Sequence, residues 1–295
     1  MSKLPPLEIL RCPRCAGPLA APAQCRTCGE FATVRGQPVL IDFSRSIFTR
    51  DGVLSAEGAS PVARSAWRRS VKQWLFGRNR AAERAAADLA HRLPPSARVL
   101  VIGGGEVGSG AERLHESFAV VGTDIYASPH TALLADAHNL PFTDGAFDAV
   151  WIQAVLEHVL EPAQVVAEIH RVLRPEGLVF ADTPFLQHVH EGAYDFTRFT
   201  LSGHRWLFRR FDLIDAGVTG GAGTALLWAV RGFVTAVTGR RVLGRAAGLA
   251  FCWLPWFDGR TRGHEDVAAG TYFYGRRSEA LVSPHAMAPF YEARR

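Results

Sequence analysis

The chain has 295 residues, 48% of them hydrophobic, which is enough for one full catalytic domain and one small additional module. Its formal net charge is +5, and almost all of the positive charge is arginine because lysine occurs only at Lys3 and Lys72. A charge excess of this size does not by itself indicate a nucleic-acid partner. The N-terminus lacks a basic stretch followed by a long apolar run, so we expect no signal peptide and a cytoplasmic protein.

Two cysteine pairs lie near the start of the chain. Cys12 and Cys15 form the first pair, and Cys25 and Cys28 form the second. A gap of two residues lets both thiolates reach one ion from a tight turn, and two such turns supply the sulfurs of a tetrahedral zinc site. The spacing predicts a compact ribbon over residues 1–45 with a structural zinc ion. Two disulfides are the alternative, which a reducing cytosol disfavours.

Residues 46–95 are predicted to form a helical linker. The ribbon ends in a strand-like segment at 37–43, and residues 44–60 have the composition of a loop. Residues 63–93 are rich in arginine and alanine and predict one or two helices, which Pro94 stops. The apolar anchors of these helices are Trp67, Trp74 and Phe76.

From residue 96 to 295, short apolar runs alternate with helical stretches, which is typical of a parallel sheet covered by helices. The predicted strands are 98–102, 118–123, 132–135, 147–152, 178–181, 211–219 and 268–277. The predicted helices are 110–116 and 162–173. The fold class is therefore α/β, with a Rossmann-like doubly wound sheet preceded by a small zinc ribbon.

A glycine-rich turn follows the first strand of this sheet. It contains Gly103, Gly105 and Gly108, and glycines let the backbone approach a ligand closely. Asp124 ends the next strand, about twenty residues further on, where a carboxylate can bind ribose hydroxyls. Two cofactors fit. The glycine spacing matches the dinucleotide fingerprint of NAD, and the adenosine half of S-adenosylmethionine makes similar demands.

Three later segments distinguish between these cofactors. Residues 136–150 read D-A-H-N-L-P-F-T-D-G-A-F-D-A-V, and they are followed by L-E-H-V at 156–159 and E-I-H-R-V-L-R-P-E-G at 168–177. Together they resemble the class I S-adenosylmethionine-dependent methyltransferases, in particular the subgroup that includes the quinone-biosynthesis methylases. The resemblance covers roughly residues 96–219 and implies a methyltransferase fold that binds S-adenosylmethionine.

The resemblance implies a set of cofactor-binding residues. Those near the methionine part are Gly103, Gly105 and Gln153. Those near the ribose and adenine are Asp124, Ile125, Asp136 and Ala137. The chain departs from the family pattern at Val101, where an acid usually precedes the glycines, and at Val107, where a third glycine is usual. These departures leave open a catalytically degenerate, cofactor-binding or scaffold protein.

The segment after the fifth strand concentrates ionisable side chains where ligands bind in open parallel sheets. The candidate bases for methyl transfer are His188, His190 and Glu191. Tyr194, Asp195 and Arg198 are candidates for orienting the acceptor. In the alternative interpretation residues 194–198 form a structural bracket, in which Asp195 caps the helix near Thr200 and Arg198 pairs with an acid.

An apolar insertion at about 222–260 separates the last two strands. Its uncharged runs are shorter than the roughly twenty residues that cross a bilayer. Two helices here can form a lid, a dimer contact, an interfacial membrane anchor or a subdomain that covers the sheet edge. This insertion and the loop after strand five favour methylation of a small, lipid-linked or glycan-type acceptor and permit peripheral membrane contact. Methylation of ribosomal or transfer RNA is the alternative.

Overall fold

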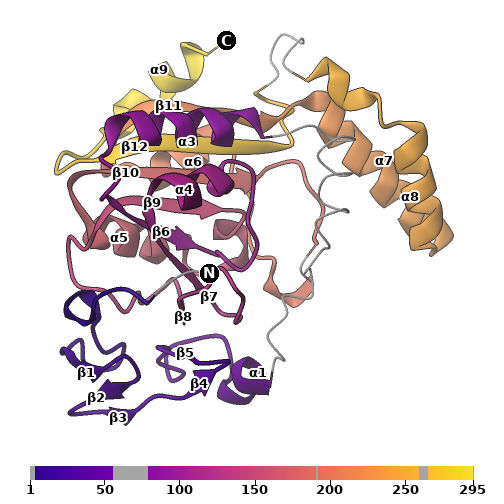
Figure 1. Ribbon diagram of the computed structural model, residues 1–295. Helices are drawn as coiled ribbons and strands as arrows, with labels where there is room; N and C mark the ends of the chain where they lie inside the picture. The colour runs from indigo at the N-terminus through magenta and orange to yellow at the C-terminus, as the bar shows by residue number, and fades with distance from the viewer. Residues whose placement is uncertain (1–3, 56–78, 191, 259–264, 295) are drawn as a thin grey trace.

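The computed structural model describes residues 4–55, 79–190, 192–258 and 265–294. Its centre is a seven-stranded sheet with helices on both faces (Figure 1). The predicted helix anchors Trp67, Trp74 and Phe76, and the candidate base Glu191, lie outside the described residues.

The strand order of the sheet is β11-β12-β10-β9-β6-β7-β8. The bounds are β6 Arg98–Ile102, β7 Ala119–Asp124, β8 Leu133–Leu134, β9 Phe147–Gln153, β10 Leu173–Pro184, β11 Phe211–Gly220 and β12 Gly270–Arg277. Strands β6 to β10 pair in parallel, whereas β12 runs antiparallel to β10 and β11. The Rossmann-like α/β prediction is confirmed, and the carboxyl ends of β6, β7, β9 and β10 share one edge.

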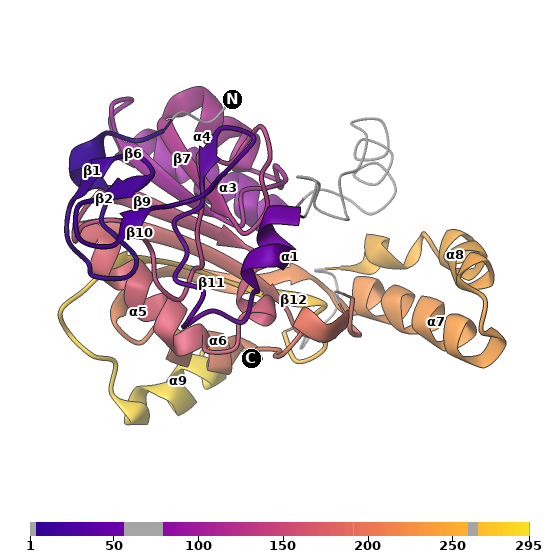
Figure 2. The same cartoon turned by 90° about the horizontal axis from the view of Figure 1, so that it is seen from below.

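Each face of the sheet carries its own apolar cluster. Helices α3 (Arg80–Arg92) and α4 (Ala111–Ser117) cover one face, and α5 (Pro162–Val172) and α6 (Leu201–Leu207) cover the other (Figure 2). The alanines of α3 form a buried stripe at helical spacing, which explains why an alanine-rich segment can pack closely on the sheet. Asn79 caps α3 by accepting the Ala82 N–H at 3.0 Å.

The N-terminal module is built from short elements. They are η1 Leu7–Ile9, β1 Leu19–Ala21, β2 Gln24–Cys25, β3 Gly29–Glu30, β4 Thr33–Val34 and β5 Gln37–Pro38. The expected strand at 37–43 is shorter, because after β5 the chain leaves β4 and runs to the sheet edge, where Leu40 N–H donates to the Leu134 carbonyl at 2.8 Å. Residues 44–60 were expected to form a loop, and this prediction is wrong for Arg50–Ser55, which form helix α1. There Val53 is buried against Val39 and Ile41.

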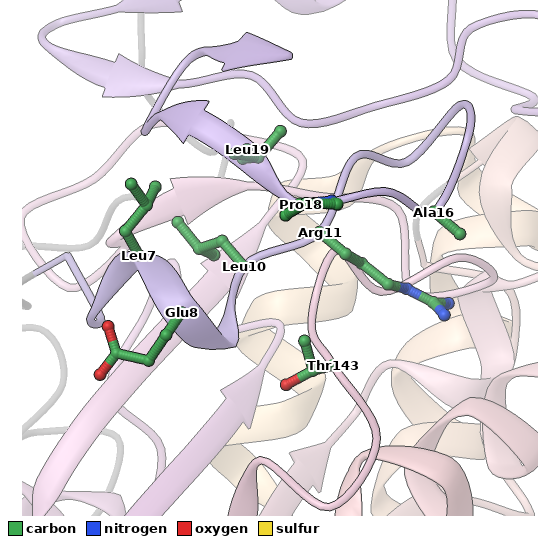
Figure 3. A pocket seen from close by; sticks show the side chains of 8 residues that line it. All are labelled: Leu7, Glu8, Leu10, Arg11, Ala16, Pro18, Leu19 and Thr143. Carbon is green, nitrogen blue, oxygen red and sulfur yellow. The ribbon is translucent and has the colours of Figure 1, made fainter. Parts of the chain in front are cut away.

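The module also docks through its first turn. Leu10 bridges Phe142 in antiparallel fashion, and Arg11 N–H donates to the Pro141 carbonyl at 3.0 Å. Figure 3 shows this seam, where Leu10 and Arg11 line a cavity of about 470 Å³ together with Thr143. Leu10 and Leu40 are almost completely buried in the same apolar cluster as Phe142. The module and the sheet therefore share one core.

The insertion forms a helical hairpin between β11 and β12. Its elements are α7 Ala222–Thr238, α8 Arg241–Ala250 and η4 Leu254–Phe257. Both views show α7 and α8 projecting from the side of the sheet and not covering it (Figures 1 and 2). Among the described helices, none is both long and apolar enough to cross a membrane. The remaining elements are η2 Leu156–His158, η3 Gly192–Tyr194, η5 Pro284–Ala286 and α9 Met287–Glu292.

Candidate functional site

The glycine-rich turn between β6 and α4 is bonded to the end of β7. Asp124 Oδ2 accepts the Gly105 N–H at 2.8 Å, and Oδ1 accepts the N–H groups of Ile125 at 2.7 Å and Tyr126 at 3.4 Å. Burial raises the pKa of Asp124, and these amide donors oppose that shift. A carboxylate has about four acceptor sites, so about one remains for a ligand hydroxyl.

The glycines of this turn allow close packing against neighbouring side chains. A Cβ on Gly105 would lie 2.7 Å from Asp124 Oδ2, and a Cβ on Gly108 would lie 2.3 Å from Gln153 Oε1. Gly103 has a φ of +73°, in the left-handed region that other residues rarely adopt. The turn can therefore bring its backbone against the ends of β7 and β9.

Asp136, the predicted adenine contact, already has two side-chain partners. Its Oδ1 lies 2.7 Å from His138 Nδ1 and also accepts the His138 backbone N–H at 2.9 Å, and its Oδ2 accepts the Ser46 hydroxyl at 2.5 Å. Burial opposes ionisation of this carboxyl, but the bonds from His138 and Ser46 lower its pKa overall. Beside it Ala137 is buried, while Ile125 is half-buried. The N-terminal segment thus contacts the predicted adenine end of the site.

The missing acid at Val101 has a packing explanation. Val101 is 6% exposed and lies in the apolar cluster that α3 and α4 form with the sheet. A carboxylate does lie two strands away, where Asp182 Oδ2 accepts from Gln153 Nε2 at 3.0 Å and from Asn79 Nδ2 at 2.7 Å. Burial raises the pKa of Asp182 to about 6. Sequence reasoning missed Asp182, although an acid at the end of the fifth apolar run was a usable signal.

Three ionisable side chains meet on the acceptor side of this edge. Glu157 and His158 lie on η2 after β9, and His190 lies in the loop after β10. One ligand atom from each lies within 4.8 Å of the other two. The two histidine rings are T-shaped with centroids 4.8 Å apart, and His158 Nε2 lies 3.7 Å from Glu157 Oε1. We call these residues the Glu157 cluster.

Glu157 is the most unusual member of the Glu157 cluster. Its side chain is buried, and neither carboxylate oxygen has a hydrogen-bond partner among the described residues. Burial raises the pKa of this carboxyl to about 8. Sequence reasoning quoted L-E-H-V as a motif but did not assign Glu157 a role. Its position directly before a histidine, a few residues after a buried strand, was the available signal.

Asp195 orients His190 and pairs with Arg198. Its Oδ2 accepts the His190 N–H at 2.9 Å and lies 3.2 Å from His190 Nδ1. Arg198 bonds to both oxygens of Asp195, with Nη2 2.7 Å from Oδ2, and this pairing lowers the pKa of Asp195 to about 2. Asp195 does not cap α6, because the cap is Thr200, whose hydroxyl accepts the Gly203 N–H at 3.0 Å.

The other candidate acceptor-side residues lie further out. Tyr194 is 44% exposed, and its carbonyl accepts a hydrogen bond from His158 Nδ1 at 2.7 Å. His188 is exposed and lies against α7, with its Nδ1 3.5 Å from where a Cβ on Gly232 would be. The structure therefore brings His158, His190 and the Asp195 carboxylate together and places the His188 ring beside the hairpin.

The four N-terminal cysteines converge. All four ligand atoms, from Cys12, Cys15, Cys25 and Cys28, lie within 4.8 Å of one another, and the Sγ atoms of Cys15 and Cys25 are 3.6 Å apart. Tetrahedral zinc with Zn–S bonds of about 2.3 Å separates its sulfurs by about 3.8 Å. All four cysteines are free thiols. Their arrangement fits one tetrahedral ion better than two disulfides.

Comparisons with known proteins cover the central strands. Residues 100–181, which run from β6 into β10, match the family described as "Methyltransferase domain". The chain is 36% identical over 91 residues to the ubiquinone/menaquinone biosynthesis C-methyltransferase of Desulfotalea psychrophila, covering 31% of this chain and 33% of that protein. It is 37% identical over 59 residues to the malonyl-[acyl-carrier protein] O-methyltransferase of Laribacter hongkongensis, which is 20% of each protein.

The chain spans a third or less of the length of these curated relatives. Among solved structures, a phosphoethanolamine N-methyltransferase of Haemonchus contortus in complex with S-adenosyl-L-methionine is similar at a TM-score of 0.47 and 16% identity. That similarity covers 80% of this chain and 59% of the other.

Proposed function

We propose that this chain, which carries a class I S-adenosylmethionine-dependent methyltransferase domain, transfers a methyl group to a small acceptor. The observation that carries the proposal is the joint position of the glycine turn and the Glu157 cluster. The turn lies at the carboxyl end of β6, and the cluster follows β9 and β10 at the same edge. In this proposal the cofactor site and the acid–base site share one edge of the sheet.

The residues at this edge suit S-adenosylmethionine, which supplies a methyl group on a positively charged sulfur when bound. Asp124, Asp136 and Asp182 end or follow three strands of the sheet, and carboxylates accept hydrogen bonds from hydroxyl, amino and ammonium groups. We assign Asp124 to the ribose and Asp136 to the adenine end. We assign Asp182, with Gln153, to the methionine end, where it replaces the acid that is absent at Val101.

The Glu157 cluster is the acid–base group in this proposal. Asp195 holds the Nδ1 side of His190, and the Tyr194 carbonyl holds the Nδ1 of His158. An imidazole fixed in this way can take the proton that an acceptor hydroxyl loses. When the adjacent Glu157 carboxyl is ionised, its negative charge stabilises the protonated imidazole. His188, the first candidate from the sequence, serves in this proposal to shape the acceptor entrance.

The acceptor class is a small molecule that is lipid-linked or of glycan type. Apolar side chains of the loop after β10 are exposed next to its ionisable ones, including Leu186 at 42% and Val189 at 62%. A relative that is named for ubiquinone and menaquinone biosynthesis supports a lipid-soluble acceptor. An RNA acceptor has no specific support in the site.

We further propose that the four cysteines hold one structural zinc ion. The convergence of Cys12, Cys15, Cys25 and Cys28 supports it, since thiolates at these separations match a closed tetrahedral site. No ligand position is left for water or substrate, so the ion stabilises the module and takes no part in methyl transfer.

Two measurements test the enzymatic proposal. Calorimetry should show binding of S-adenosylmethionine and none of NAD, and mass spectrometry should find labelled small products after incubation with methyl-labelled cofactor and host extract. His190→Ala should reduce turnover by about 10²–10⁴-fold with cofactor affinity unchanged. His285→Ala, at an exposed histidine on η5, is the matched control. Cofactor binding without any labelled product would favour the degenerate scaffold.

A further inference from the structure

The α7–α8 hairpin, residues 222–257, packs its helices together through small residues. Gly244 and Gly248 of α8 are buried. A Cβ on Gly244 would lie 2.0 Å from Thr235 Oγ1, and a Cβ on Gly248 would lie 2.6 Å from Arg231 Cδ. A G-x-x-x-G spacing permits this close approach of helix backbones. The inner face of the hairpin therefore holds glycine and polar side chains.

Large apolar side chains lie on the outer surface instead. Phe233 and Val237 on α7 are each 69% exposed, and Val242 on α8 and Trp256 on η4 are each 71% exposed. A hairpin surrounded by water would be expected to bury such residues between its helices. Several large apolar side chains exposed on one small element are typical of a contact with another apolar phase or molecule.

The charge on the hairpin has one sign. Residues 222–257 contain four arginines, Arg231, Arg240, Arg241 and Arg245, and no aspartate, glutamate or lysine. The acid at the root of the hairpin, Asp258, caps α7 by accepting the Gly223 N–H at 2.8 Å and the Thr224 hydroxyl at 2.5 Å. The hairpin thus combines exposed apolar side chains with positive charge that no acid within residues 222–257 balances.

We propose that the α7–α8 hairpin docks on an anionic phospholipid surface, with its outer apolar side chains in the interfacial region and the exposed Arg240, Arg241 and Arg245 at the headgroups. Interfacial helices combine an apolar face with arginine in this way, and tryptophan favours the same depth. No described helix, α7 included, is both long and apolar enough to cross a bilayer, and the proposal is therefore one of surface docking. A second copy is a poorer occupant, because it would place the exposed arginines of one hairpin against those of the other.

Docking would place the candidate acceptor loop beside the membrane. His188 lies against Gly232 of α7, and the neighbouring Val189 is 62% exposed. The loop after β10 would then face the surface from which a lipid-linked acceptor is presented. The docking proposal itself rests on the hairpin and does not depend on the proposed methyl transfer.

Vesicle flotation of the full chain tests the proposal. The wild type should float with vesicles of phosphatidylglycerol and phosphatidylcholine, much less with phosphatidylcholine alone, and less at high salt. The variant R240Q/R241Q/R245Q should bind anionic vesicles about 100-fold more weakly, at about fivefold per arginine. The variant F233S/W256S should also lose binding.

Matched controls lie outside the hairpin, at R113Q on α4 and at L281S after β12, where Leu281 is 67% exposed. Both should float as the wild type does. Circular dichroism should show that all variants are folded. Three results would overturn the proposal. The first is absence of flotation, and the second is a dimer that depends on the hairpin and does not bind vesicles. The third is binding to RNA that depends on the arginines and is unchanged in F233S/W256S.

Discussion

The N-terminal module and the α7–α8 hairpin are both additions to the same sheet, but their apolar side chains have opposite environments. In the module, Leu10 is 1% exposed and Leu40 is fully buried, because both pack into the core beneath β8 and β9. In the hairpin, Phe233 and Val242 are about 70% exposed. Apolar side chains therefore extend the core in one region and form an external surface in the other.

The difference follows from where each addition is bonded to the sheet. The module pairs with the edge strand through Leu40 and with residue 142 through Leu10, so its backbone is part of the sheet's hydrogen-bond pattern. The hairpin is fixed at its root, where Asp258 caps α7, while its helices extend away from the sheet (Figure 1). Substitutions in an element that is hydrogen-bonded to the sheet along its length should change the free energy of unfolding of the whole domain. Substitutions in an element that is attached only at one end should have a local effect.

Metal removal should have the largest effect and should separate the two regions. The Cys12 and Cys25 side chains belong to the same apolar cluster as the sheet, and structural zinc in small modules contributes on the order of 10 kcal/mol to folding. A strong chelator should lower the melting temperature of the whole domain while leaving the helices of the hairpin protected from hydrogen exchange. A metal-free chain that melts at the same temperature would contradict both the zinc site and the shared core.

A matched pair of side-chain truncations to alanine tests the next largest effect, which is a change in the free energy of unfolding. Leu40→Ala removes fully buried hydrocarbon and should lower the free energy of unfolding by about 2–5 kcal/mol. Val242→Ala removes exposed hydrocarbon and should change it by less than about 0.5 kcal/mol. Urea titration measures both. Equal losses would mean that the hairpin packs on the domain in solution.

The smallest expected effect, taken per pH unit, is a pH dependence confined to the body of the protein. The pKa of Glu157 is raised from 4.5 to about 8, so between these values the folded chain holds a proton that the unfolded chain has lost. This contribution to stability is complete below pH 4.5 and disappears as the pH rises through 8. Glu157→Gln should remove up to about 1.4 kcal/mol per pH unit from the slope between pH 5 and 8.

Glu116→Gln, at an exposed acid on α4, is the control for that experiment and should keep the wild-type slope. The hairpin contains no aspartate, glutamate or histidine between residues 222 and 257. Its helix content should therefore be independent of pH over the same range. A wild-type slope that survives in Glu157→Gln would assign the pH dependence to other groups.

Much of the sheet was predictable because its strands are continuous apolar runs between clear helix signals. Strand β6 begins and ends as predicted, and α5 ends one residue early, at Val172. The role of residues 39–41 was not predictable, because pairing with β8 depends on a partner far away in sequence. In the site, the convergence of Glu157 with His190 was missed for the same reason. His188 was favoured because it closely follows the fifth strand in the sequence, but in the structure its ring lies beside α7.

The bridges from Leu10 to Phe142 and from Val39 to Leu134 also bear on the order in which the protein folds. Contacts between residues so distant along the chain form late, because the intervening loop must close first. During synthesis the module emerges before the strands that complete its core. Its apolar side chains therefore stay exposed until β8 and the segment that follows it have been synthesised. The proposed metal binding at the cysteine turns would be local and could precede that step. In that order the module is already folded when the strands of the sheet form and pack against it.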